Sequence, residues 1–98
     1  MKKTPQNIPF EDYLDQKLTD PEFAEHYRRE RLINETAVLV HTLRKKAKLS
    51  QEELSKIAHT RQPVIARLER GLDKRVPSLD LLDRIANAVG KELHISFK

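Results

Sequence analysis

The segment LSQEELSKIAHTRQPVIARLERG, residues 49–71, carries two short helical patterns that meet at a polar junction, AHTRQ. Ser50 is followed by Glu53 at the capping-box spacing, which predicts the start of the first helix. The inward face of this helix is formed by Leu54, Ile57 and Ala58. The second helix follows the junction and ends at Gly71, so we expect two short helices joined by a tight turn.

The outward face of the second helix is polar and basic. On a helical wheel, the inward side holds Val64, Ile65 and Leu68. The outward side holds Gln62, Pro63, Ala66, Arg67 and Arg70. Glutamine pairs well with adenine and arginine with guanine, and a helix packed against another across a tight turn fits the major groove. The same wheel also fits an ordinary surface helix with solvated arginines.

The flanking segments are also helical in pattern. Residues 22–62 contain neither proline nor glycine, and Asp20-Pro21-Glu22 is a helix start, so a helix is expected from there to about Lys48. The sequence leaves open whether this stretch is one helix or bends near Asn34. A shorter helix precedes it, with Phe10, Tyr13, Leu14 and Leu18 on one face. A last helix runs from a cap at Ser78 to Gly90.

The segment KELHISF, residues 91–97, alternates apolar and polar residues, which predicts a strand. No other segment has a strand pattern, so we expect antiparallel pairing with the same segment of a second copy across a two-fold axis. A frayed tail is the alternative. The dimer interface would be formed by Leu93, Ile95 and Phe97.

The predicted fold class is therefore all-α, with five or six helices and one C-terminal strand. Residues 1–33 form an N-terminal helical extension, residues 34–90 a helix-turn-helix domain, and residues 91–98 the dimerisation strand.

The charge distribution favours an anionic partner for the larger part of the chain. The net charge is +4, but residues 1–33 hold six Lys/Arg against seven Asp/Glu, whereas residues 34–98 hold thirteen against eight. A basic domain suits nucleic acid, although a solvated lysine-rich surface has the same composition.

Several classes of chemistry have no support in the sequence. The chain has no cysteine, which excludes disulfides and thiolate metal sites and is compatible with the reducing cytoplasm. There is no phosphate-binding loop and no nucleophile–base pattern, so we expect neither an enzyme nor a cofactor. No apolar run suggests a signal peptide or a membrane span. No metal-ligand spacing connects the four histidines, His26, His41, His59 and His94.

The motifs LSQEEL and IARLERG, within residues 39–90, resemble the helix-turn-helix of the phage-repressor/Cro-like (Xre) family. The resemblance implies that Gln51 contacts a phosphate and that the recognition helix starts at Arg61. It also implies base contacts from the positions of Gln62, Pro63 and Arg67, of which Pro63 offers only apolar contact. A structural ion pair is implied between Arg44 and Glu69. Together with the outward-facing Arg70, the predicted DNA-binding residues are Gln51, Arg61, Gln62, Arg67 and Arg70.

The chain departs from the family pattern at the turn. His59 stands where the family usually has a glycine at positive φ, and histidine tolerates that conformation at some strain. Arg61 replaces the usual Ser or Thr cap, with Thr60 one residue earlier, so the start of the recognition helix is open by one residue.

The N-terminal pattern FEDYL…LTDPEFAEHYRRE resembles Xre-type antitoxins of the HigA-like group, whose partners are RelE/HigB-like ribonuclease toxins. The resemblance implies a repressor of its own operon that acts as a homodimer and neutralises a toxin. The candidate toxin-binding residues are Phe10, Tyr13, Leu14, Phe23 and Tyr27, which could equally pack onto their own domain. The alternatives are a stand-alone regulator or a protein-interaction module with an incidental basic face.

Overall fold

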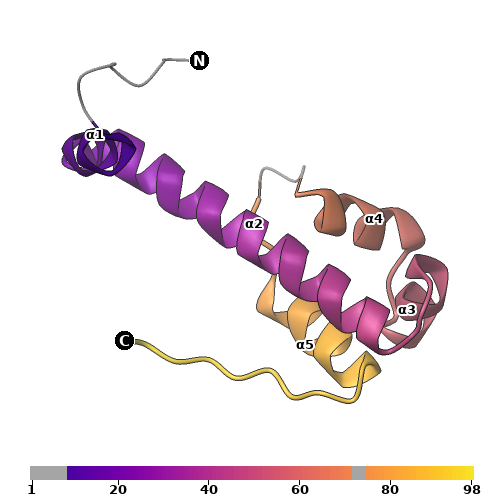
Figure 1. The fold of residues 1–98 in the computed structure, drawn as a ribbon. Coiled ribbons are helices and arrows are strands. Elements are labelled where there is room, and N and C mark those ends of the chain that lie inside the picture. The colour runs from indigo at the N-terminus through magenta and orange to yellow at the C-terminus, as the bar shows by residue number, and fades with distance from the viewer. Residues whose placement is uncertain (1–8, 72–74) are drawn as a thin grey trace. The chain divides into compact units, whose positions relative to one another are not determined.

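The computed structural model describes residues 9–71 and 75–98 of the chain, and within them the fold is all-α, as predicted. The described residues form five helices: α1 (Phe10–Lys17), α2 (Pro21–Lys46), α3 (Gln51–Ile57), α4 (Gln62–Arg70) and α5 (Leu79–Ala88) (Figure 1). The chain divides into two compact units, Met1–Arg31 and Leu32–Lys98, which we call unit 1 and unit 2 and describe separately.

Helix α2 is one continuous helix of 26 residues. The chain therefore forms one helix here, and not two helices that meet near Asn34. The carboxylate of Asp20 accepts the backbone N–H of Glu22 at 3.0 Å, which satisfies one of the free donors at the helix start. At the other end, Lys48 has φ 59° and the N–H of Leu49 donates to the carbonyl of Arg44 at 3.2 Å. This left-handed residue turns the chain sharply toward α3.

The core of unit 2 lies where α3 packs against both α4 and α5. Its buried side chains are Val40, Leu54, Ala58, Ile65, Leu68 and Ile85. Full burial of one such aliphatic side chain stabilises the fold by about 1.5–3 kcal/mol. The inward face predicted for α4 is confirmed at Ile65 and Leu68, which are buried, while Val64 is half-buried. In the face predicted for α3, Leu54 and Ala58 are buried, but the prediction is wrong for Ile57, which is 49% exposed.

The turn between α3 and α4 contains the strain expected from the sequence. His59 has φ 55°, and the N–H of Thr60 closes the helix end by donating to the carbonyl of Ser55 at 2.8 Å. Arg84 of α5 reaches across and donates from Nη1 to the carbonyls of Ala58 and His59, at 3.3 and 2.6 Å. Because α3 ends in unsatisfied carbonyls, this arginine stabilises the turn with a charge of the favourable sign. No local sequence pattern predicts this contact.

The end of α4 lies close to α2 because residue 71 is glycine. Gly71 has φ 65°, and a Cβ at this position would lie 3.2 Å from Oδ1 of Asn34 and 3.8 Å from Cβ of Ala37. Both the backbone conformation and the narrow gap therefore favour a residue without a side chain.

The strand predicted for residues 91–98 is not formed in the single chain, and no described residue is in a strand. The physical reason is that a strand needs hydrogen bonds to a neighbour, and the helices have no free edge to offer. The segment leaves α5 as an uncoiled stretch (Figure 1). Ile95 and Phe97 are 58% and 100% exposed, while Leu93 is half-buried. Pairing across a dimer stays a prediction.

Candidate nucleic-acid interface

The start of α3 is fixed by a complete capping box. Ser50 Oγ accepts the N–H of Glu53 at 3.0 Å, and the Glu53 carboxylate accepts the N–H of Ser50 at 2.9 Å. The bond from the Ser50 backbone is the main reason that the pKa of Glu53 lies below its usual value. The cap makes Gln51 the first residue of α3 and leaves its side chain half-exposed at the helix start.

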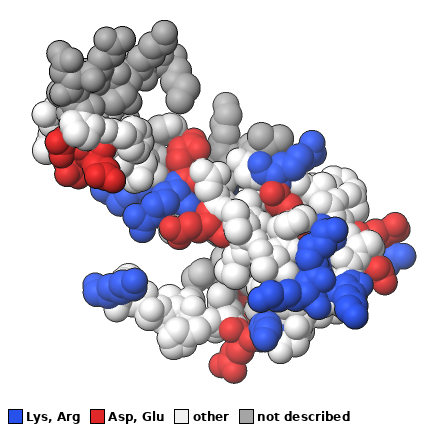
Figure 2. Space-filling view, viewed as in Figure 1, with Lys and Arg blue, Asp and Glu red and all other residues white. Residues whose placement is uncertain are grey.

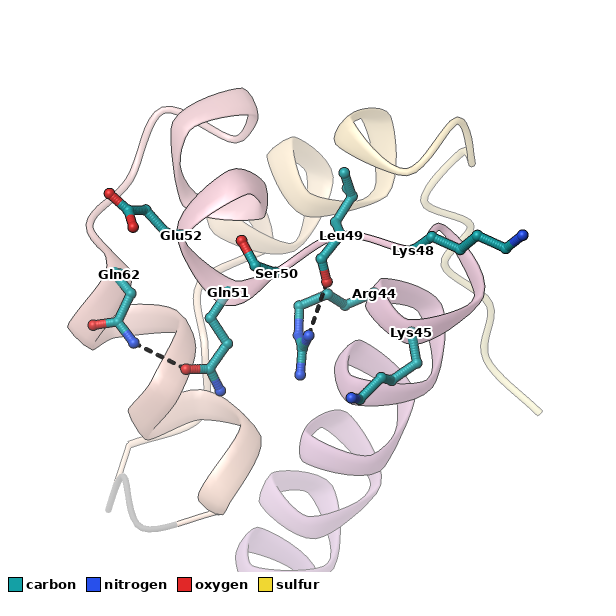
Figure 3. A pocket seen from close by; sticks show the side chains of 8 residues that line it. All are labelled: Arg44, Lys45, Lys48, Leu49, Ser50, Gln51, Glu52 and Gln62. Atoms are coloured by element: carbon teal, nitrogen blue, oxygen red, sulfur yellow. Dashed lines mark hydrogen bonds between the residues drawn. The ribbon is translucent and has the colours of Figure 1, made fainter.

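The start of α4 falls one residue after Arg61, which has an extended backbone and makes no side-chain cap. Thr60 is therefore not the cap, and the helix begins at Gln62, with Pro63 in the first turn where no N–H is required. Gln62 Nε2 donates to Gln51 Oε1 at 2.9 Å, so these two side chains meet between the starts of α3 and α4 (Figure 3).

The outward face of α4 carries the residues that the sequence placed there. The exposed side chains in and just before the helix are Arg61, Gln62, Pro63, Arg67 and Arg70, and Ala66 lies half-buried among them. Arg70 Nε donates to the Ala66 carbonyl at 3.4 Å. Within the described residues, the side chains of Arg61 and Arg67 make no hydrogen bond or ion pair, so their donors are available to an external partner.

An ion pair connects α2 to α4 behind this face. Arg44 donates from Nε to Glu69 Oε2 at 2.6 Å and from Nη2 to Oε1 at 2.9 Å. Only 8% of the Arg44 side chain and 4% of the Glu69 side chain are exposed. Arg44 also donates from Nη1 to the carbonyl of Leu49, at 2.9 Å. The pair expected from the family resemblance thus holds α4 against α2 and the loop before α3.

Glu69 accepts further hydrogen bonds. His41 Nδ1 lies 2.8 Å from Oε1, and Gln51 Nε2 lies 3.4 Å from the same oxygen. Burial raises the pKa of Glu69, but the hydrogen bonds from Arg44, His41 and Gln51 favour the ionised form, and the net pKa is lowered. Because Gln51 bonds both Glu69 and Gln62, the buried carboxylate helps to orient the two glutamines at the surface.

A broad groove of about 830 Å³ opens beside this network. Its lining includes two residues that the sequence analysis did not single out, Lys45 and Lys48, together with Ser50, Gln51 and Gln62. Figure 3 shows Lys45 on the last turn of α2 and Lys48 on the turn that follows it, and Figure 2 shows basic side chains gathered on unit 2. The available signal was the basic run RKKAK, residues 44–48, which ends two positions before the cap of α3 at Ser50. Such a rim suits the phosphate backbone of a duplex.

The candidate toxin-binding residues lie in unit 1. Phe10 of α1 is exposed, whereas Tyr13, Leu14, Phe23 and Tyr27 are half-buried. The rings of Phe23 and Tyr27 stack along α2 with centroids 6.4 Å apart. The structure thus leaves Phe10 the most available of the five to a partner.

Other kinds of site find no support in the part of the chain that is described. No group of three or more potential metal ligands comes together there. None of the helices within residues 9–71 and 75–98 has the length and apolarity needed to cross a membrane.

Two short helices joined by a tight turn, with the second presenting glutamine and arginine, define a helix-turn-helix module of the DNA-binding class. The comparison with protein families agrees, since the model described as helix-turn-helix matches residues 40–95, more than half of the chain. The chain therefore belongs to the helix-turn-helix family, of the Xre/Cro type, and is a DNA-binding transcriptional regulator. No curated protein and no solved structure matches it.

Proposed function

We propose that this chain is a sequence-specific repressor that inserts α4 into the major groove of an operator. In this proposal Gln62 and Arg67 read base edges, while Arg61 and Arg70 lie near the backbone. Gln51 contacts a phosphate at the start of α3. The observation that carries the proposal is the hydrogen bond from Gln62 to Gln51, because it orients a base-reading side chain before DNA arrives.

Lys45 and Lys48 extend the proposed contact surface to the DNA backbone. Both line the groove that also contains Gln51 and Gln62. Lysine contacts of this kind add affinity that depends on salt and carries little sequence information.

The proposed repressor acts as a homodimer. Two copies can place their recognition helices about 34 Å apart and read successive major grooves of a palindrome, which a single copy cannot do. The uncovered apolar side chains of the C-terminal segment, Ile95 and Phe97, support an interface there.

The biological role we propose is that of an antitoxin in the cytoplasm, which neutralises a RelE/HigB-like ribonuclease toxin and represses its own operon. Two observations support a separate partner surface on unit 1. Met1–Arg31 forms its own compact unit, and Phe10 is exposed on α1. The slight acidic excess of residues 1–33 suits a basic toxin. The surface would be centred on Phe10, Tyr13, Leu14, Phe23 and Tyr27.

Two experiments test the two parts of the proposal. Footprinting on the DNA upstream of its own gene should reveal a protected palindrome, and absence of any protection would contradict autoregulation. Co-expression with the neighbouring gene should restore growth that the neighbour alone arrests. A neighbour that is harmless, or a chain that does not bind its product, would leave a stand-alone regulator as the better description.

A further inference from the structure

The C-terminal segment combines an exposed apolar face with an unpaired backbone. Leu93, Ile95 and Phe97 alternate with Glu92, His94, Ser96 and Lys98. Phe97 is 100% exposed and Ile95 is 58% exposed. Beyond Lys91, no backbone hydrogen bond joins the segment to any described residue. Such an edge readily pairs with another strand.

An apolar groove of about 300 Å³ lies next to this segment in unit 2. Its walls come from α2 and α5, and residues 91–94 form one side. The apolar lining includes Leu39, Leu43, Leu82 and Leu93. Leu39 is 56% exposed, which is unfavourable for a leucine in a groove that stays open to water.

We propose that this groove receives Phe97 of a second copy, in an antiparallel pairing of the two C-terminal segments with Ile95 on the two-fold axis. The inference rests on the proposed dimer and specifies its register and its contacts. The exposed ring of Phe97 has no cover in its own chain, and each of two symmetric copies offers one ring and one groove.

The register follows from matching side chains across the pair. With Ile95 opposite itself, Leu93 lies opposite Phe97 and Glu92 lies opposite Lys98 of the other copy. All apolar residues then share one face, and the charges across the strands are opposite. These exposed charges select the register more than they strengthen the dimer.

Neighbouring registers are less favourable. If the two-fold axis passes through His94, Phe97 lies opposite Lys91 of the other copy. If the axis passes between His94 and Ile95, Lys91 lies opposite Lys98. A slip of one residue also turns apolar side chains toward the polar face of the partner strand. Among these registers, only the one centred on Ile95 both pairs opposite charges and keeps the apolar residues on one face.

The same register brings Phe97 to the groove. Directly opposite residues in an antiparallel pair project from the same face, with Cβ atoms about 4.5–5.5 Å apart. Because Leu93 lines the groove, Phe97 of the second copy is placed beside it, over Leu39 and Leu82. Burial of the two rings alone removes about 300–500 Å² of surface from water.

A cysteine scan tests the register, because the natural chain contains no cysteine. Under mild oxidation, full-length Ile95→Cys should form a covalent dimer efficiently. His94→Cys and Ser96→Cys are the matched controls, since each is displaced by about 7 Å along the strand from its own copy. That displacement exceeds disulfide geometry. Preferential cross-linking at either control position, or none at Ile95, would overturn the register.

The occupant of the groove is tested by fluorescence, because the chain contains no tryptophan. Phe97→Trp should show a blue shift of its emission as protein concentration rises and the dimer forms. Adding Leu39→Glu should abolish the shift and raise the dimer dissociation constant by at least about tenfold. Leu79→Glu is the control, because Leu79 is similarly exposed at 59% but does not line the groove. Equal effects of the two glutamates would overturn the assignment.

The outcomes separate this inference from the proposed repressor. A chain that sediments as a monomer at every concentration, yet protects operator DNA, overturns the inference and leaves DNA reading by α4 intact. Cross-linking through Ile95 in a chain that binds no DNA supports the inference and contradicts the repressor.

Discussion

Glu69 accepts hydrogen bonds from Arg44, His41 and Gln51 while 4% of its own side chain is exposed. Replacing it with alanine leaves the guanidinium of Arg44 buried without a counter-charge. We expect Glu69→Ala to lower the free energy of unfolding by about 3–5 kcal/mol, measured by urea denaturation. The paired change Arg44→Met/Glu69→Leu should cost much less than the sum of the two single changes. Additive losses would show that the two side chains do not depend on each other.

The lowered pKa of Glu69 also determines how the free energy of unfolding should change as the pH falls. Its pKa is lowered from an ordinary value of 4.5, so ionised Glu69 contributes stability that is present above that value and lost as the pH falls through the lower, folded-state pKa. Glu53, whose pKa is also lowered, acts in the same direction. Unfolding free energies below about pH 5 should therefore fall more steeply for the natural chain than for Glu69→Gln. Parallel curves for the two proteins would contradict this.

At the scale of the helices, the turn that follows α2 holds a residue in a strained backbone conformation. Lys48 has φ 59°, a conformation in which glycine is less strained, yet the residue is a lysine on the rim of the proposed DNA groove. Lys48→Gly should raise the free energy of unfolding by about 0.5–1 kcal/mol. It should also weaken DNA binding. The slope of log affinity against log salt concentration should fall by the amount expected for about one lost phosphate contact. Lys56→Ala, at an exposed position of α3 outside the groove lining, is the charge control.

The helices differ in how well the sequence predicts them, and the reasons are physical. α3 and the buried face of α4 were predictable because the Ser50 cap and the spacing of Ile65 and Leu68 are local signals. The start of α4 was not, since Arg61 makes no side-chain cap that would mark it. The continuity of α2 depends on the mere absence of a breaker, which is a weak signal.

Contacts between distant residues were predictable only through resemblance. The Arg44–Glu69 pair was expected from the family, whereas the bonds from Arg84 to the α3–α4 turn join residues far apart in sequence and leave no pattern. The C-terminal strand was predicted from alternation, but strand formation needs a partner that one chain does not supply.

At the scale of the whole chain, the two units predict separable functions. A chain that starts at Leu32 keeps α3, α4, α5 and the buried core of unit 2. It should retain most of the affinity for DNA and, if the proposed antitoxin role holds, lose the ability to neutralise the co-expressed product of the neighbouring gene. Full-length Phe10→Ala should show the same loss without any truncation, because Phe10 is exposed and contributes little to folding. If the truncated chain is unfolded by circular dichroism, unit 1 is needed for the fold rather than for a partner.

The central claim is that the outward face of α4 reads DNA sequence, and the ratio of specific to non-specific affinity measures it most directly. The duplex that the chain selects from a random pool is compared with an unrelated duplex of equal length. Gln62→Ala and Arg67→Ala should each lower this ratio. The difference between the specific and non-specific binding free energies should shrink by about 1–3 kcal/mol in each variant. Gln51→Ala should weaken both affinities through the lost phosphate contact. It should also lower the ratio, by less than the two α4 variants do, because it frees the side chain of Gln62. Arg29→Ala, in unit 1, should change neither. An unchanged ratio in both α4 variants would contradict the assignment of α4 as the recognition helix.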